Sequence, residues 1–215
     1  MTTAALRASR ALWLRRERYR YRKWVFYRDK SKRPIAERTE LRRKWWRLYE
    51  QARRMRVRRD RQIAAKTPLR VKALAEAKKL IGVMEVGGNN MGAKVLEIIR
   101  ANGGTGPEPW CGDFVAWCYR RAGSKVVQRA WAAVRYLGFL TGMKIVKTPL
   151  PGDIVCFTFD HTGIYVRDLG GGQIETVEGN TGRTGAVSDS ATGGDGVYLK
   201  RRPKSQVSRY VRVTR

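Results

Sequence analysis

The hydrophobic pattern of this 215-residue chain changes once, near Pro151-Gly152-Asp153, and the change restricts the folds available to it. Before this turn, apolar residues recur every three or four positions, the spacing of amphipathic helices. After it, short apolar segments alternate with Gly, Asp and Asn, which is typical of strands joined by turns. The expected strands are residues 154–159, 161–166, 173–178, 196–201 and 210–213. Helices first and an antiparallel sheet afterwards predict an α+β fold.

The first 66 residues predict a separate unit of two helices. The second helix carries apolar residues on one face, at steps of four and three positions: Leu41, Trp45, Leu48, Ala52 and Met55. Pro34 separates it from the first helix, because proline does not fit inside a helix. The expected helices are residues 4–31 and 35–65. Two such helices joined by a short turn form an antiparallel hairpin.

Thr67-Pro68 marks the expected boundary between this hairpin, residues 1–66, and a second domain, residues 67–215. The second domain is long enough to bury a hydrophobic core of its own. Its expected helices are residues 71–81, 92–100, 111–122 and 126–140. The predicted architecture is therefore N-terminal helices packed on an antiparallel sheet, preceded by a basic helical hairpin.

The two predicted domains differ in charge. Residues 1–66 hold 24 Lys and Arg against 6 Asp and Glu, a net charge of +18, and residues 67–215 carry the remaining +10. Closely spaced arginines repel one another unless an anionic partner is present. The excess of positive charge therefore predicts such a partner for residues 1–66, and anionic wall polymer, anionic membrane and nucleic acid all fit.

The cysteines and the apolar segments limit where the protein is expected to be made. Three cysteines are too few, and odd in number, for a disulfide framework, which favours reduced thiols. The longest early apolar run, residues 11–14, is too short for a signal peptide. No run reaches the roughly 18 apolar residues of a membrane span. We therefore expect synthesis in a cytoplasm without a signal peptide.

One cysteine stands where a nucleophile would be placed. Cys111 follows Pro109-Trp110 and begins a predicted helix, where unpaired backbone N–H groups and the helix dipole favour a thiolate. An isolated cysteine is more often a small buried apolar residue, and that is the expectation for Cys118 and Cys156. The prediction for Cys111 depends on its combination with a base, and His161 is the single histidine of the chain.

Strand pairing brings candidate partners to His161. If Arg167 lies opposite Ile174 in a hairpin of two strands, Gly163 lies opposite Glu178, and His161 lies opposite Asn180. Side chains alternate along strands, so the imidazole, the carboxylate and the amide share one face. A thiol, an imidazole and a polar orienting group are the parts of a cysteine nucleophile with its base. Whether Glu178 or Asn180 bonds the imidazole stays open at this stage.

These residues resemble the CHAP family, the cysteine, histidine-dependent amidohydrolases and peptidases. The resemblance covers roughly residues 70–215 and is carried by residues 109–118, 161–166 and 178–180. It implies a papain-like domain in which Cys111 is the nucleophile and His161 the base. By the same resemblance, the catalytic residues Glu178 and Asn180 orient and polarise the imidazole or support the oxyanion. Many members are phage endolysins, which implies an amidase or endopeptidase that cleaves bacterial peptidoglycan.

Two further expectations concern the surroundings of Cys111. Some members of the family bind calcium through aspartates before the cysteine, but residues 103–109 contain none. No Cys and His spacing suits zinc either, so we expect no metal and no cofactor. Trp110, beside the nucleophile, is a candidate substrate-binding residue, with plain core packing as the alternative.

A second functional hypothesis comes from the charge alone. The chain could be a basic nucleic-acid-binding or virion structural protein that retains a catalytically idle cysteine-peptidase-like scaffold. The complete set of Cys111, His161, Glu178 and Asn180 counts against an idle scaffold. The favoured hypothesis is a peptidoglycan hydrolase that acts on the bacterial cell wall, either as a free lysin or carried in a virion.

Overall fold

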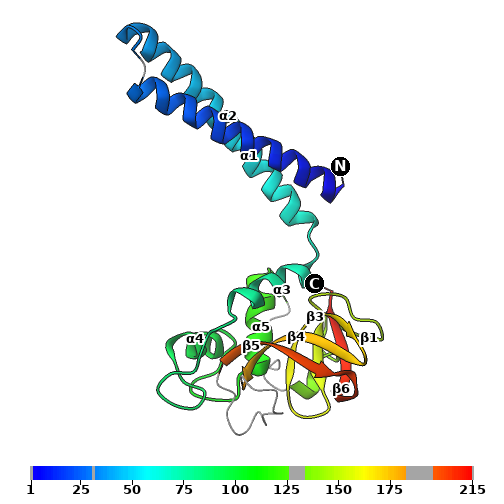
Figure 1. The fold of residues 1–215 in the computed structure, drawn as a ribbon. Coiled ribbons are helices and arrows are strands. Elements are labelled where there is room, and N and C mark those ends of the chain that lie inside the picture. Colours follow the sequence, from blue (N-terminus) through cyan, green and yellow to red (C-terminus); the bar gives the residue numbers. More distant parts are fainter. Residues whose placement is uncertain (1, 31, 126–133, 183–195, 215) are drawn as a thin grey trace. The chain divides into compact units, whose positions relative to one another are not determined.

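The computed structural model describes residues 2–30, 32–125, 134–182 and 196–214. The chain divides into two compact units, Met1–Thr67 and Pro68–Arg215, which are described separately (Figure 1). The first is a long helical hairpin, and the second packs helices on a sheet that has six antiparallel strands within the described residues. The predicted α+β class is therefore confirmed.

The first unit consists of α1 (Thr3–Val25), a π-helical turn (Phe26–Lys30) and α2 (Ile35–Lys66). The apolar stripe predicted on α2 is wholly or partly buried along its length. The first helix is shorter than predicted, because its last turn widens into the π-helical turn before Pro34 begins α2.

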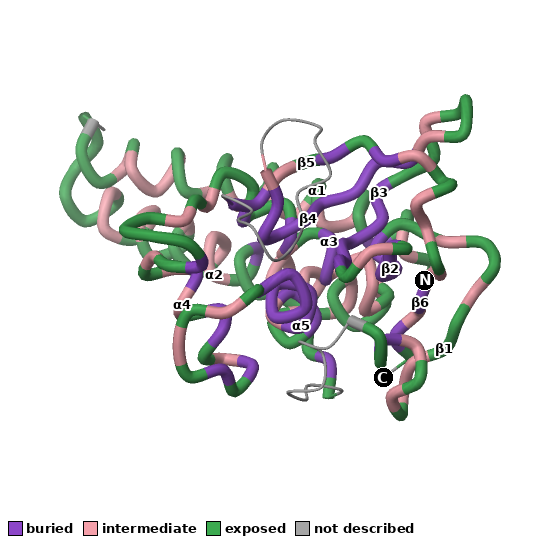
Figure 2. The backbone as a smooth tube through the Cα atoms, turned by 90° about the horizontal axis from the view of Figure 1, so that it is seen from below, coloured by how far each residue is buried: buried purple, intermediate pink, exposed green. Residues whose placement is uncertain are grey.

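Among the described residues of the second unit, three α-helices precede the sheet. They are α3 (Leu69–Lys79), α4 (Ala93–Ala101) and α5 (Cys111–Arg121), each within two residues of the predicted bounds. Most of the helix expected at residues 126–140 lies outside the described residues, and Val134–Tyr136 form a 3-10 turn. Helix α5 is the central one, since α3 and α4 pack against it and its other side packs on the sheet. Eight of its eleven residues are buried, and Figure 2 shows this burial along the helix.

The sheet has the strand order β1-β6-β2-β3-β4-β5, with every neighbouring pair antiparallel. Its strands are β1 (Met143–Val146), β2 (Ile154–Phe157), β3 (Thr162–Gly170), β4 (Gln173–Thr181), β5 (Gly196–Pro203) and β6 (Val207–Val213). Five of them correspond to predicted strands, and β1 was not predicted. Helix α5 packs on β3 and β4, so the sequence motifs of α5, β3 and β4 meet in the centre of the domain.

The register of β3 on β4 was predicted correctly only near the candidate site. Ile164 pairs with Val177, as expected, but Arg167 pairs with Glu175 rather than with Ile174. A bulge after Tyr165 shifts the outer half of the hairpin by one residue. The strands also run further than predicted, because consecutive glycines with positive φ at 170–172 allow a tight turn.

Gly179 allows β4 to pack directly against the start of α5. A Cβ atom at this position would lie 2.6 Å from Phe114 Cγ and 2.8 Å from Trp110 Cζ3, closer than real contacts allow. We expect Gly179→Ala to lower the free energy of unfolding by about 1–3 kcal/mol, because both rings belong to the packed core. Thermal or denaturant unfolding would measure it. Gly106→Ala is the control, since nothing lies within 4 Å of that Cβ; equal effects would contradict the explanation.

Candidate active site

Cys111 is the first residue of α5 and is almost fully buried. The residue is only 3% exposed, and Trp110 occupies the N-cap position before it. The first N–H groups of a helix have no intrahelical partner, so this end of α5 favours negative charge. The other two cysteines, Cys118 and Cys156, are fully buried. Burial raises the pKa of both thiols, that of Cys156 to about 11, which keeps them protonated.

His161 precedes β3 and is completely buried. Its ring stacks with the rings of Phe157 and Phe159, at centroid distances of 5.6 and 5.9 Å. Nε2 lies 3.0 Å from Oε2 of Glu178. Nδ1 has no hydrogen-bond partner of standard geometry among the described residues, which leaves it available to the Cys111 thiol. Burial lowers the pKa of His161, but interactions with Cys111 and Glu178 outweigh it and raise the pKa to about 9.

Glu178 is buried on β4 and held by Arg202 of β5. Nη2 of Arg202 donates to Oε2 of Glu178 at 2.6 Å, and Nε donates to Oε1 at 3.0 Å. The hydroxyl of Thr176 also donates to Oε1, at 2.5 Å. Burial raises the pKa of Glu178, but the contacts with His161 and Arg202 outweigh it and lower the pKa to about 2. The carboxylate is therefore charged at neutral pH, and its charge stabilises a protonated imidazole.

Arg202 was missed by the sequence analysis. It is 2% exposed, and its guanidinium carbon lies 5.4 Å from the Phe157 ring and 5.7 Å from the Phe159 ring. Strand alternation was the signal that could have found it. Thr176 and Glu178 pair with Lys200 and Tyr198 of β5, so Arg202 continues the same face of that neighbouring strand.

Asn180 lies at the site but bonds elsewhere than the imidazole. Its backbone φ of 55° is left-handed, which interrupts the alternation of β4. Assigned from its hydrogen-bond partners, its amide accepts from the Trp110 backbone N–H at 3.2 Å and donates to Asn90 Oδ1 at 3.2 Å and Glu85 Oε1 at 3.3 Å. The amide therefore anchors the start of α5, and Glu178 is the residue that bonds His161. Neither Glu85 nor Asn90 belongs to a motif that sequence reasoning could have singled out.

Trp110 is fully buried, which favours the core-packing alternative over a substrate-binding role. Its indole N–H donates to Oε1 of Glu85 at 2.9 Å, and its ring packs edge-on against Phe114. Through these contacts Trp110 and Asn180 hold the backbone that carries Cys111.

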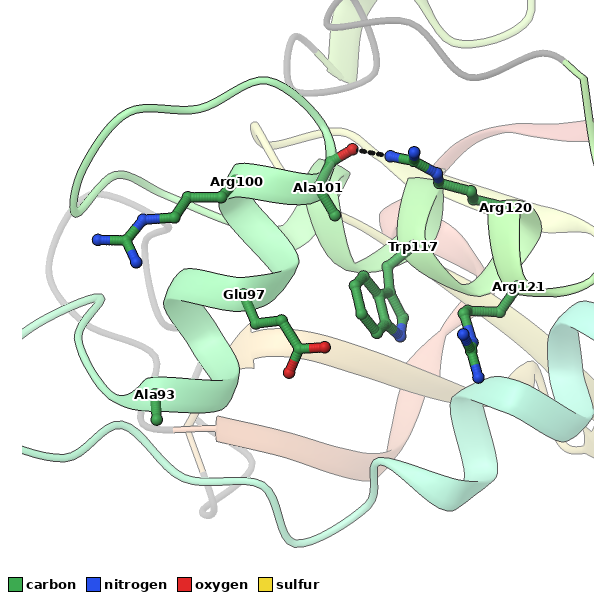
Figure 3. Close-up of a pocket in the computed structure, with 7 residues that line it drawn as sticks. All are labelled: Ala93, Glu97, Arg100, Ala101, Trp117, Arg120 and Arg121. Atoms are coloured by element: carbon green, nitrogen blue, oxygen red, sulfur yellow. Dashed lines mark hydrogen bonds between the residues drawn. The ribbon is translucent and has the colours of Figure 1, made fainter.

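A pocket of about 750 Å³ elsewhere in the domain includes none of these residues. It lies between α4 and α5, where Glu97 and the Trp117 indole point toward one another and Arg120 bonds the carbonyl of Ala101 (Figure 3). Among the described residues, no three His, Cys, Asp or Glu side chains are placed to hold a metal ion together. No described helix is long and apolar enough to cross a bilayer.

The fold and the site resemble those of hydrolases that use cysteine and histidine: the thiol at the start of α5 interacts with the buried imidazole that precedes β3. Comparison with known families finds a match to part of the chain. Residues 102–180 match the CHAP domain, and the match includes Cys111, His161, Glu178 and Asn180. Arg202 lies beyond it. The CHAP domain implies an amidase or peptidase that acts on peptidoglycan. No curated protein and no solved structure matches the chain.

Proposed function

We propose that the protein is a peptidoglycan amide hydrolase of the phage lysin type, with Cys111 as nucleophile and His161 as general base and acid. The observation that carries this proposal is the buried series Cys111, His161, Glu178 and Arg202, in which each group acts on the next. An inert scaffold has no need for a charged carboxylate and guanidinium in its core, because burying them costs desolvation energy.

The proposed reaction is acyl transfer through a thioester. The Cys111 thiol passes its proton to His161, and the sulfur attacks the carbonyl carbon of an amide. Backbone N–H groups at the start of α5 stabilise the oxyanion of the tetrahedral intermediate. The imidazolium then protonates the leaving amine as the C–N bond breaks. Water, deprotonated by His161, attacks the thioester, which releases the carboxylic acid and restores the thiol. Because Cys111 is 3% exposed, the carbonyl must approach along a narrow path or the site must open.

Residues 1–66 would hold the enzyme on an anionic surface of the bacterial envelope, either wall polymer or membrane. Their net charge of +18 supports this role. Such binding weakens as salt rises, because exposed charges are screened beyond about 8 Å at physiological ionic strength. Synthesis in a host cytoplasm, followed by action on the wall or carriage in a virion, is the localisation we propose with it.

The same charge is the one observation that favours a second function, binding of nucleic acid by a virion structural protein. That function would leave the buried series Cys111, His161, Glu178 and Arg202 without a role. Salt-sensitive DNA binding by a protein that releases nothing from cell walls would support it.

Digestion of purified sacculi, followed by mass spectrometry of the soluble products, tests the proposed function. We expect new amino groups without new reducing sugar ends. Sacculi of different cross-bridge chemistry show which bond is cut: cleavage between muramic acid and L-alanine indicates an amidase, and cleavage within the peptide indicates an endopeptidase. New reducing ends would contradict amide hydrolysis, as would a folded protein that releases no fragment from any wall type.

A further inference from the structure

The end of the hairpin nearest its turn exposes large apolar and aromatic side chains. We call this the aromatic end; its members that are more than 40% exposed are Tyr19, Tyr21, Phe26, Ile35 and Trp46. They lie on the last turns of α1, the π-helical turn and the first part of α2 (Figure 1). Ile35 is 74% exposed. Packing of α1 on α2 therefore leaves a large part of each of these side chains uncovered.

The rings of the aromatic end form a continuous surface. Trp24 packs on Trp46 at 5.2 Å between centroids, and Trp46 packs on Tyr49 at 5.2 Å. Tyr21 contacts both Trp24, at 5.8 Å, and Tyr49, at 5.6 Å. Tyr and Trp have apolar rings with one polar group, and they are the residues enriched where a bilayer meets water.

A pocket of about 320 Å³ opens within this surface, lined by Trp24, Thr39, Arg42, Arg43 and Trp46. Among the described residues, neither arginine has a carboxylate partner, and the Nε–H of Arg42 is buried without an acceptor. A buried donor without an acceptor is unfavourable. Phosphate is an anion that guanidinium groups bind through paired hydrogen bonds, and both arginines line this pocket.

A second pocket further along α2 provides an internal comparison. It measures about 380 Å³ and is also rich in arginine, including Arg53 and Arg54. Its lining contains the carboxylate of Glu50 and no aromatic ring. Glu50 lies 3.7 Å from Arg53. The two pockets thus each contain a pair of adjacent arginines on the same helix, and of these two pairs only Arg42 and Arg43 share their pocket with aromatic rings.

We propose that the pocket at Arg42 and Arg43 binds the phosphate of an anionic phospholipid while the aromatic end lies in the surface of the bilayer. This rests on the anion-binding role proposed for residues 1–66 and names the anion. A soluble polyanion would gain nothing from the exposed Ile35 and Phe26, whereas a bilayer surface buries them. Nucleobases stack on free ring faces, and here Trp24, Trp46 and Tyr49 already contact one another through tilted rings.

Binding of the full chain to vesicles tests the proposal. We expect sedimentation with vesicles of equal parts phosphatidylglycerol and phosphatidylcholine at about 0.15 M salt, together with a shift of tryptophan emission to shorter wavelength. Pure phosphatidylcholine vesicles should bind far less. The double variant Arg42→Gln and Arg43→Gln should weaken binding roughly tenfold or more, the order expected when basic groups leave an anionic lipid surface. Arg53→Gln with Arg54→Gln removes the same charge outside the aromatic end and should weaken it much less.

The outcomes separate the possible partners. Equal losses of vesicle affinity in the two double variants would contradict a specific phosphate site at Arg42 and Arg43. They would indicate that binding depends on the overall positive charge of the hairpin. Tighter binding to double-stranded DNA or to purified wall polymer than to the anionic vesicles would overturn the lipid assignment. Circular dichroism checks that both variants stay helical, as expected because Gln favours helix almost as well as Arg. Vesicle binding requires no cleavage, so its failure leaves the proposed hydrolysis standing, and the reverse also holds.

Discussion

Replacing Cys111 with Ala is expected to lower the rate of amide cleavage by at least about a thousandfold, because no other group can form the thioester. His161→Ala should have a similar effect, since the thiol then loses the group that takes its proton. The initial rate of amine release from soluble peptidoglycan fragments measures both. Cys118→Ala is the matched control: it removes a fully buried thiol from the same helix, and its rate should stay near that of the unchanged protein.

Alkylation gives the same prediction an independent readout. Burial and a raised pKa protect Cys118 and Cys156, so iodoacetamide should modify Cys111 first, and loss of activity should follow that modification. Thermal unfolding of each variant shows whether the fold survives. A folded Cys111→Ala protein that retains a tenth of the original rate would exclude Cys111 as the nucleophile.

The parts of the fold that the sequence predicted are those encoded by local periodicity. Helices α3, α4 and α5 have apolar faces that recur at helical spacing, so their bounds follow from nearby residues. Strand β1 was missed because Met143–Val146 is four residues long and none of them is fully buried. Its place beside β6 depends on pairing with residues about 70 positions later, such as Met143 with Val213, which no local pattern contains.

The candidate site divides in the same way. The candidate residues Cys111 and His161 were visible in the motifs, and strand alternation brought Glu178 to the imidazole. The choice between Glu178 and Asn180 needed the backbone, because the left-handed conformation of Asn180 turns its amide toward Trp110. Arg202 reaches Glu178 only through the pairing of β4 with β5. The local sequence therefore identifies His161 as the candidate base, while long-range strand pairing determines which residues hold it in place.

Arg202 is expected to control both the stability of the domain and the pH range of its activity. Arg202→Met keeps the length of the side chain and leaves the buried Glu178 carboxylate without its guanidinium. We expect the free energy of unfolding at neutral pH to fall by about 3–5 kcal/mol, the usual effect of removing one partner of a buried ion pair. Denaturant unfolding measures this loss. Arg202→Lys retains the charge without the paired donors, so its free energy of unfolding should lie between those of the unchanged protein and Arg202→Met.

The pH dependence distinguishes this role from simple packing. The pKa of Glu178 is lowered from 4.5 to about 2, so its contribution to stability is present above pH 4.5 and is lost as the pH falls towards 2. The pKa of His161 is raised from 6.5 to about 9, so its contribution is complete below pH 6.5 and is lost as the pH rises through 9.

Weakening the contacts that hold the Glu178 carboxylate should therefore lower the pH above which activity is lost. We expect cleavage by the unchanged protein to persist to about pH 9, where the imidazolium that protonates the leaving amine is lost. In Arg202→Lys the carboxylate loses the paired donors that fix its position against His161, so its contact with the imidazolium weakens and activity should decline at lower pH. Rates of cleavage of soluble fragments, measured from pH 5 to 10, give the alkaline limit of the unchanged protein and of Arg202→Lys. An unchanged pH profile in a variant that is less stable would assign Arg202 a packing role and remove it from the series that positions His161.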